Sequence, residues 1–118
     1  MNSKYSKKHK LKIDISVVIV TYNSEDHIIK CLKSIYCKKN ANISIETIII
    51  DNNSKDNTLN LIRDNFPNLK VLINNKNKGF SNAVNLGFRK SRGKNIFLLN
   101  PDTKVFENTL EKLLFKIN

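Results

Sequence analysis

The stretch ISVVIVTYN, residues 15–23, decides the fold of this chain. Its first seven residues are a nearly continuous run of β-branched side chains, which is typical of a strand buried on both faces of a parallel sheet. Similar apolar runs occur at residues 45–51, 69–73 and 95–99. The sequence therefore predicts four strands.

Segments with helical spacing of apolar residues alternate with these strands. Ser24 is expected to cap a first helix that extends to Tyr36. Further helices are predicted from about residue 56 to 65, ending before Pro67, from about 81 to 91, and over the last residues of the chain. This alternation predicts an α/β fold with a mostly parallel sheet of about four strands and flanking helices.

The chain has 118 residues, which allows one domain, and a formal net charge of +11. Residues 1–12 carry five lysines and no acid, so we expect them to form a basic, flexible tail preceding a folded domain at residues 13–118. A solvated basic surface and a tail that touches anionic lipid are both compatible with this charge. No recognisable nucleic-acid-binding motif accompanies it, so no nucleic-acid partner is expected.

The two cysteines, Cys31 and Cys37, lie six residues apart on one predicted helix. That spacing turns them about 240° away from each other, which does not suit metal ligation or a disulfide. They are expected to be reduced packing residues of a cytoplasmic protein. The apolar runs are also too short to span a bilayer, so any membrane contact would be peripheral, through the basic tail.

Polar side chains follow three of the predicted strands, at the point where each strand ends. In a parallel sheet these ends share one edge, where ligands bind. The chain lacks both a G-x-G-x-x-G and a G-x-x-x-x-G-K-[ST] sequence, which argues against ordinary dinucleotide and P-loop sites. The polar residues that this geometry brings together are Thr21, Tyr22, Asn23, Asp51, Asn52, Asn53, Asn100 and Asp102.

Each of these residues also has a plainer interpretation. The ring of Tyr22 can stack on a nucleobase or pack at the entrance of a helix. Asp51 begins a turn, as aspartates in loops often do, and Asp56 is better explained as a helix cap than as a ligand. Asp102 is suited to hold a hard divalent cation, although N-P-D-T is also an ordinary turn sequence.

Four stretches, in their order and spacing, carry a resemblance to a known family over nearly the whole chain from Ile15 onward. They are VVIVTYNSEDHI at residues 17–28, IIIDNNSKDNT at 48–58, NKGFSNAVNLGF at 77–88 and IFLLNPDT at 96–103. Together they resemble the N-terminal, nucleotide-sugar-binding half of family-2 glycosyltransferases of the GT-A fold. The last stretch is similar to the D-x-D element of rhamnosyltransferase-like members, with Asn100 in place of the first acid and Asp102 kept.

The resemblance implies a donor such as a UDP- or dTDP-sugar. Asp102 would bind Mg²⁺ or Mn²⁺ across the donor diphosphate, and Asp51 would contact the base or the ribose. Gly79 and Asn82 would border the ribose and the sugar. The full set of nucleotide-binding residues carried over in this way is Thr21, Tyr22, Asn23, Asp51, Asn53, Gly79, Asn82 and Asn100.

The activity implied is inverting sugar transfer to a glycan or lipid-linked acceptor in cell-wall or polysaccharide biosynthesis. In this family the catalytic base lies in a second half, after the D-x-D element, and Glu107 and Glu111 come too early to match it. We therefore expect a truncated domain without a catalytic base, which either self-associates or works with a separate acceptor half. The alternative is a non-catalytic nucleotide-sugar-binding module, or one subunit of a split enzyme.

Overall fold

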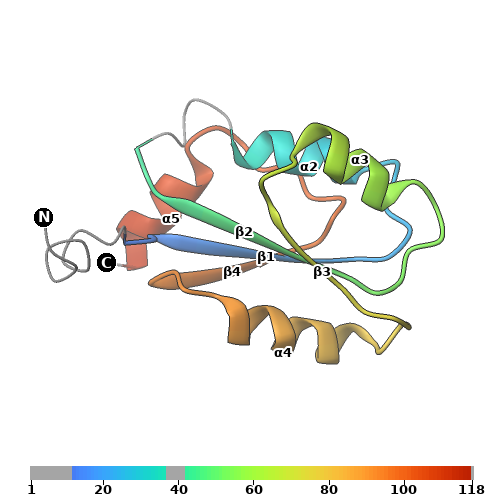
Figure 1. The fold of residues 1–118 in the computed structure, drawn as a ribbon. Coiled ribbons are helices and arrows are strands. Elements are labelled where there is room, and N and C mark those ends of the chain that lie inside the picture. The colour runs from blue at the N-terminus through green and yellow to red at the C-terminus, as the bar shows by residue number, and fades with distance from the viewer. Residues whose placement is uncertain (1–11, 37–41, 118) are drawn as a thin grey trace, which may run out of the picture.

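The computed structural model describes residues 12–36 and 42–117, and within them four parallel strands form one sheet (Figure 1). The strand order is β3-β2-β1-β4, and β1 pairs with both β2 and β4. The predicted α/β fold with a parallel sheet of four strands is confirmed. The strands are β1 (Ile15–Thr21), β2 (Ile45–Asp51), β3 (Lys70–Ile73) and β4 (Asn95–Leu99).

Helices cover both faces of the sheet. Among the described residues, three helices lie on one face and α4 lies on the other (Figure 1). The helix α4 begins within one residue of its predicted start, and α3 begins two residues later than predicted. The helices are α2 (Ile28–Ile35), α3 (Thr58–Asn65), α4 (Phe80–Lys90) and α5 (Thr109–Ile117).

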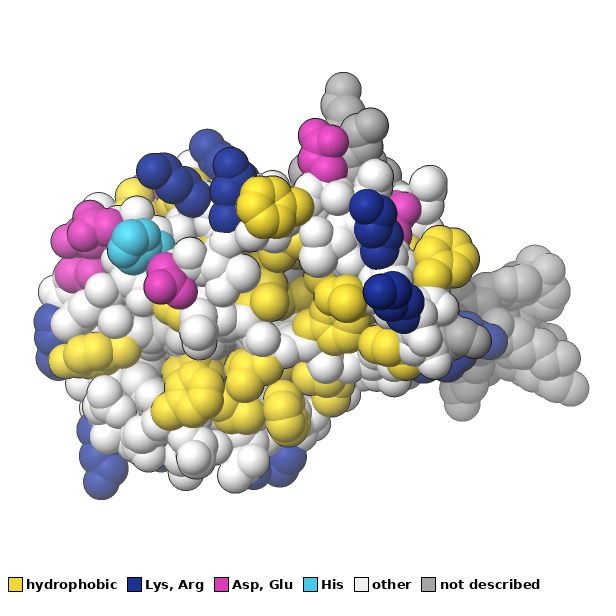
Figure 2. Space-filling view, turned by 180° about the vertical axis from the view of Figure 1, so that it is seen from behind, with side chains coloured by type: hydrophobic (Ala, Val, Ile, Leu, Met, Phe, Trp, Pro, Cys, Tyr) yellow, Lys and Arg dark blue, Asp and Glu magenta, His cyan; other side chains and the backbone are white. Residues whose placement is uncertain are grey.

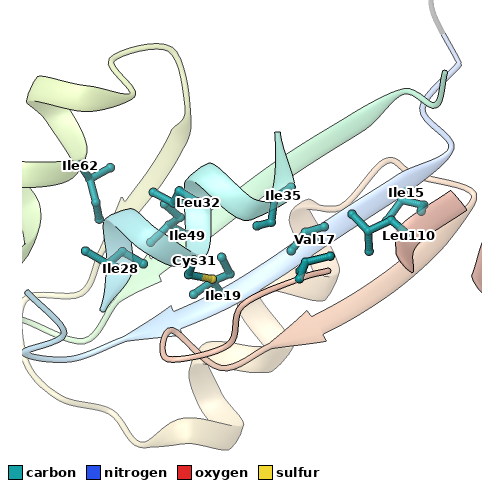
Figure 3. Packing of buried hydrophobic residues seen from close by; sticks show 11 residues of the cluster. Ile15, Val17, Ile19, Ile28, Cys31, Leu32, Ile35, Ile49, Ile62 and Leu110 are labelled. Atoms are coloured by element: carbon teal, nitrogen blue, oxygen red, sulfur yellow. The ribbon is translucent and has the colours of Figure 1, made fainter. Parts of the chain in front are cut away.

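The main hydrophobic core lies between the sheet and the three-helix face. Alternate residues of β1, namely Ile15, Val17 and Ile19, point into it and are fully buried (Figure 3). The helix α2 supplies most of the other side, and Leu110 of α5 lies beside Ile15 (Figure 3). Further members of this cluster are Ile28, Cys31, Leu32, Ile35, Ile49, Ile62 and Val105.

A smaller core lies between the sheet and α4, where Ala83 packs with residues of β1 and β2. A Cβ atom on Gly87 would collide with the side chain of Val18, so the glycine lets α4 lie close against β1. The helix does not cover β4 in the same way. Ile96 and Leu98, which project on the α4 side of the sheet beside Ser16 and Val18, each remain 40% exposed.

The predicted start of the first helix was wrong. The helix α2 begins at Ile28 rather than after Ser24, because the Ser24 hydroxyl points back to the carbonyl oxygen of Tyr22, 3.4 Å away, instead of capping the helix. Cys31 is a buried packing residue, as expected. Cys37 and nearly all of the basic tail, residues 1–11, lie outside the described residues.

Candidate functional site

The carboxyl ends of β1 and β2 lie side by side. Thr21 pairs with Asp51 at the last position of both strands. The ladder then continues beyond the strands, because the N–H of Asn52 donates to the carbonyl of Thr21 (2.9 Å) and the N–H of Asn74 donates to that of Asp51 (2.8 Å). The loops that follow β1, β2 and β3 therefore start from one edge of the sheet. The sequence predicted this edge for the loops after β1, β2 and β4, and β4 also ends there, since its Leu99 pairs with Ile19.

Asp51 holds the turn that follows β2. Its side chain is fully buried, and its carboxylate accepts hydrogen bonds from the N–H groups of Asn53 (3.0 Å) and Ser54 (2.8 Å) and from the Ser54 hydroxyl (2.6 Å). Asn53, at φ +76°, takes the left-handed conformation that such a tight turn requires. A contact between Asp51 and a nucleotide stays a prediction.

Asn23 joins the loop after β1 to the loop after β2. Its side-chain oxygen accepts the N–H groups of Lys55 (2.7 Å) and Asp56 (3.3 Å), and its own N–H donates to the Ser54 hydroxyl (2.9 Å). Asn23 sits at φ +51°, a conformation that asparagine tolerates better than most residues. The two loops are thus fixed to each other before any ligand arrives.

Asp56 strengthens this connection from a position just before the start of α3. The expectation that it caps this helix was wrong, because Asn57 is the N-cap residue and makes no side-chain capping bond. The Asp56 carboxylate accepts the N–H and the hydroxyl of Thr58 (3.0 and 2.5 Å) and, from the other loop, the N–H of Glu25 (3.2 Å). Burial acts to raise the pKa of Asp56, but the hydrogen bonds from Thr58 and Glu25 outweigh it and hold the pKa below its ordinary value.

A third connection, through Asn52, was missed by the sequence reasoning. Asn52 is buried, and its amide donates to the carbonyl of Gly79 (3.2 Å) while its oxygen accepts from the amide of Asn74 (2.8 Å) and the N–H of Lys78 (3.5 Å). It thereby fixes the loop that leads into α4, where Gly79 adopts φ +87°. The only signal in the sequence was the pair of asparagines after each of two strands, which also fits any turn.

The remaining residues predicted on this side differ in exposure. The Tyr22 side chain is 47% exposed, so its ring is accessible. Asn82 is exposed on the first turn of α4. The Thr21 hydroxyl is fully buried and finds no hydrogen-bond partner in the part of the chain that the structure describes.

The segment after β4 is held much more loosely. Asn100 and Asp102 are both exposed. The carbonyl of Asn100 accepts the N–H of Thr103 (3.0 Å) and the thiol of Cys31 (3.8 Å). Burial first, and then the negative charge of Asp102, raise the pKa of the Cys31 thiol to about 11. Within the described residues no hydrogen bond joins this segment to the loops after β1 and β2.

The donor atoms on this edge fit only part of a divalent-cation site. Among the described residues, no three His, Cys, Asp or Glu side chains come together as a metal-binding group. Mg²⁺, however, is often held by one or two carboxylates together with substrate phosphates, and the exposed Asp102 carboxylate fits that role. Asp102, with the amide oxygen of Asn100 nearby, is therefore the group that would hold Mg²⁺ or Mn²⁺.

Glu111 lies at the other end of the sheet. It follows Leu110, which packs beside Ile15 where β1 begins (Figure 3). Asp102, in contrast, follows the end at which β4 stops. Glu107 is exposed in the segment that leads to α5.

The sequence matches the model of one protein family, described as glycosyl transferase family 2, over residues 16–118. The chain is 30% identical over 101 residues to the glycosyltransferase AglE of Haloferax volcanii, covering 83% of this chain and 33% of that protein. It is also 30% identical over 104 residues to the minor teichoic acid biosynthesis protein GgaB of Bacillus subtilis, covering 86% of this chain and 12% of that protein.

Solved structures agree with these sequence matches. Residues 1–349 of S. aureus TarS align with a TM-score of 0.76 and 26% identity, covering 89% of this chain and 32% of that one. The same protein in complex with UDP-GlcNAc aligns with a TM-score of 0.75 and 27% identity. This chain has the GT-A nucleotide-binding fold and belongs to glycosyl transferase family 2. It spans about a third or less of the length of these relatives.

No helix in the described part of the chain is long and apolar enough to cross a membrane.

Proposed function

We propose that this chain binds a nucleoside-diphosphate sugar, UDP- or dTDP-linked, at the carboxyl ends of β1, β2 and β4, as the donor-binding part of an inverting glycosyltransferase. The observation that carries the proposal is the family match over residues 16–118, together with the polar loops that meet at one edge of the sheet. The S. aureus TarS structures in complex with UDP and with UDP-GlcNAc support the choice of ligand.

Different residues of this chain contact different parts of the donor. The accessible ring of Tyr22 stacks on the base, beside the loops that Asn23, Asp51 and Asn52 fix. Gly79 and Asn82 border the ribose and the sugar. Asp102 faces the diphosphate, where a bound Mg²⁺ or Mn²⁺ would neutralise the charge that develops on the leaving nucleoside diphosphate.

The acceptor is a glycan or a lipid-linked sugar of a cell-wall or other polysaccharide, by analogy with relatives such as GgaB and the succinoglycan biosynthesis protein ExoO. Deprotonation of the acceptor hydroxyl needs a general base, and we assign it to a polypeptide beyond these 118 residues. Glu111 does not take this role, because it follows Leu110 at the opposite end of the sheet. Glu107 comes too soon after Asp102 to match the base of the family. The protein acts in the cytoplasm, at the inner membrane surface where its basic tail meets anionic lipid.

Calorimetry with UDP, dTDP and UDP-GlcNAc, with and without Mn²⁺, tests the donor site. We expect binding in Mn²⁺ that Asp102→Ala weakens by about tenfold or more, a loss of about 1.4 kcal/mol. Asp64→Ala, a change to an exposed acid on α3, is the matched control and should bind like the wild type.

Two results would contradict the proposal. Metal-independent binding that survives Asp102→Ala would remove Asp102 from the site. Acceptor-dependent release of nucleoside diphosphate by the chain alone would show that its base is already present, since general-base help is worth about 10² to 10⁴ in rate. Tight binding without turnover, even when an acceptor half from a relative is added, would instead favour a non-catalytic binding module.

A further inference from the structure

Two hydrogen bonds tie the segment after β4 to α2, one on each side of Asp102. The thiol of Cys31 donates to the carbonyl of Asn100 (3.8 Å), and the N–H of Val105 donates to the hydroxyl of Ser34 (2.9 Å). Cys31 points from α2 toward the sheet (Figure 3), and Ser34 follows three residues later on the same side of the helix. Both ends of the stretch that carries Asp102 are therefore held by one face of α2.

The bond to Ser34 is the stronger of the two. Ser34 is only 8% exposed, and its hydroxyl also donates to the carbonyl of Cys31, one turn back in the helix (2.7 Å). That bond fixes the hydroxyl hydrogen and leaves an oxygen lone pair for the N–H of Val105. Val105 is 7% exposed and packs into the main core, so its N–H depends on a protein acceptor. A thiol is a weak donor, so the bond from Cys31 adds less.

The stretch between the two bonds is too long to lie flat against α2. The two helix residues are about 4.5 Å apart along the helix axis, whereas residues 100–105 could span about 17 Å when extended. They loop outward instead, and a bond from the N–H of Thr103 to the carbonyl of Asn100 (3.0 Å) closes the turn. Pro101 restricts the backbone of this turn, from which Asp102 is exposed. The position of the Asp102 backbone therefore depends on how the two ends are held.

A cation at this turn would have few carboxylates to choose from. Among the described residues, no three His, Cys, Asp or Glu side chains come together as a metal-binding group. On the face seen from behind, the acidic side chains do not gather in one place (Figure 2). A cation held by one carboxylate and substrate phosphates depends strongly on where that carboxylate lies. Groups that only orient a metal ligand are typically worth about 10- to 100-fold in metal affinity.

We propose that Ser34, assisted by Cys31, is a positioning residue that fixes the turn after β4 so that the Asp102 carboxylate meets the donor diphosphate and its cation. This inference rests on the proposed function, because it assigns how that same site is held. Ser34 is buried and acts through the backbone of the turn. The helix is a firm support for it, since Leu32 and Ile35 are fully buried in the main core.

Calorimetric titration of the 118-residue chain with UDP and dTDP, in Mn²⁺ and in EDTA, measures how much affinity the metal adds. We expect Ser34→Ala to reduce this gain by about tenfold and to leave the metal-free affinity within about twofold of the wild type. Ser34→Thr keeps the hydroxyl and should restore most of the gain. Cys31→Ala, which removes the weaker bond, should reduce the gain by about threefold.

A change elsewhere in the core controls for lost stability. Ile62→Val removes one buried methylene group on α3 and should keep the gain in full, even where urea unfolding shows a stability loss similar to that of Ser34→Ala. Circular dichroism identifies any variant that fails to fold. If Ser34→Ala does not fold, Ser34→Thr and Cys31→Ala still test the proposal.

A double-mutant cycle shows whether Ser34 acts through Asp102. In an Asp102→Ala background, Ser34→Ala should weaken nucleotide binding in Mn²⁺ no further. If the wild-type chain gains no affinity from Mn²⁺, the proposed role of Asp102 fails and this proposal fails with it. If the wild type gains affinity but Ser34→Ala keeps the gain, or weakens binding equally with and without Asp102, only the positioning role is overturned.

Discussion

The loops after β1 and β2 and the segment after β4 belong to one candidate site, but they are built differently. Asp51 is fully buried and its carboxylate accepts three hydrogen bonds, whereas Asp102 is exposed and accepts none from the described residues. The first region is fixed by the protein alone. The second region leaves the Asp102 carboxylate free for a metal ion and a diphosphate. Asp51 and Asp102 both match positions of the family motifs, yet the motif alone does not tell whether a carboxylate stabilises the loop or binds the ligand.

The largest expected effect is the difference in stability between Asp51→Ala and Asp102→Ala. Removing the Asp51 carboxylate leaves two N–H groups and a hydroxyl without their acceptor, which should lower the free energy of unfolding by about 3 kcal/mol. Asp102→Ala, on the exposed segment, should change it by less than about 0.5 kcal/mol. Urea unfolding of both variants measures the difference, and equal losses would show that the two regions are built alike.

Asn52→Ala should give the next largest effect, a loss of about 2 kcal/mol. The change removes a buried amide that holds Gly79, Asn74 and Lys78, and takes away the oxygen that accepts from the Asn74 amide and the Lys78 N–H. Asn75→Ala, exposed in the same loop, is the control and should lie within about 0.5 kcal/mol of the wild type. Thermal or urea unfolding measures the loss. If Asn52→Ala were as stable as the wild type, the hydrogen bonds of Asn52 would not hold the loop that leads into α4.

The pH dependence of stability should identify Asp56 as part of the fixed region. Because its pKa is lowered on folding, Asp56 adds stability above its unfolded-state pKa of about 3.9, and this is lost as the pH falls through the folded-state value. Asp56→Asn should therefore show a shallower loss of stability below about pH 4 than the wild type. Thr58→Val, which removes one donor to the carboxylate, should lie between them, and parallel curves for all three would contradict the assignment.

The smallest effect should appear at Cys31, a core residue whose thiol pKa is raised by burial and in part by the charge of Asp102. Its thiol pKa of about 11 reflects burial first and the Asp102 charge second, so Asp102→Asn should lower that pKa by only a small amount. The pH profile of alkylation, measured in a Cys37→Ser background, reports the shift. A profile unchanged by Asp102→Asn would place the carboxylate farther from α2 than the structure does.

Much of this fold could be read from the sequence, because its strands carry a strong local signal. The β-branched runs at residues 15–21 and 45–51 gave the correct strands. Asp56 was expected to cap α3, but Asn57 is the N-cap residue of that helix. The start of α2 was wrong, because Ser24, Glu25 and Asp26 have the right chemistry for a helix start. In the folded chain Ser24 and Glu25 instead bond to the loop that begins α3.

The sequence by itself determined the family, the alternation of strands and helices and the set of polar residues at the strand ends. Only the tertiary structure decided what those residues do for the fold, since hydrogen bonds such as Asn23 to Lys55 and Asn52 to Gly79 join residues far apart in the chain. Local sequence patterns reveal periodicity and turn residues. A hydrogen-bond partner some thirty positions away produces no such pattern in the sequence. The same holds for the place of β4 beside β1, because a strand's sequence does not tell which neighbours the sheet will give it.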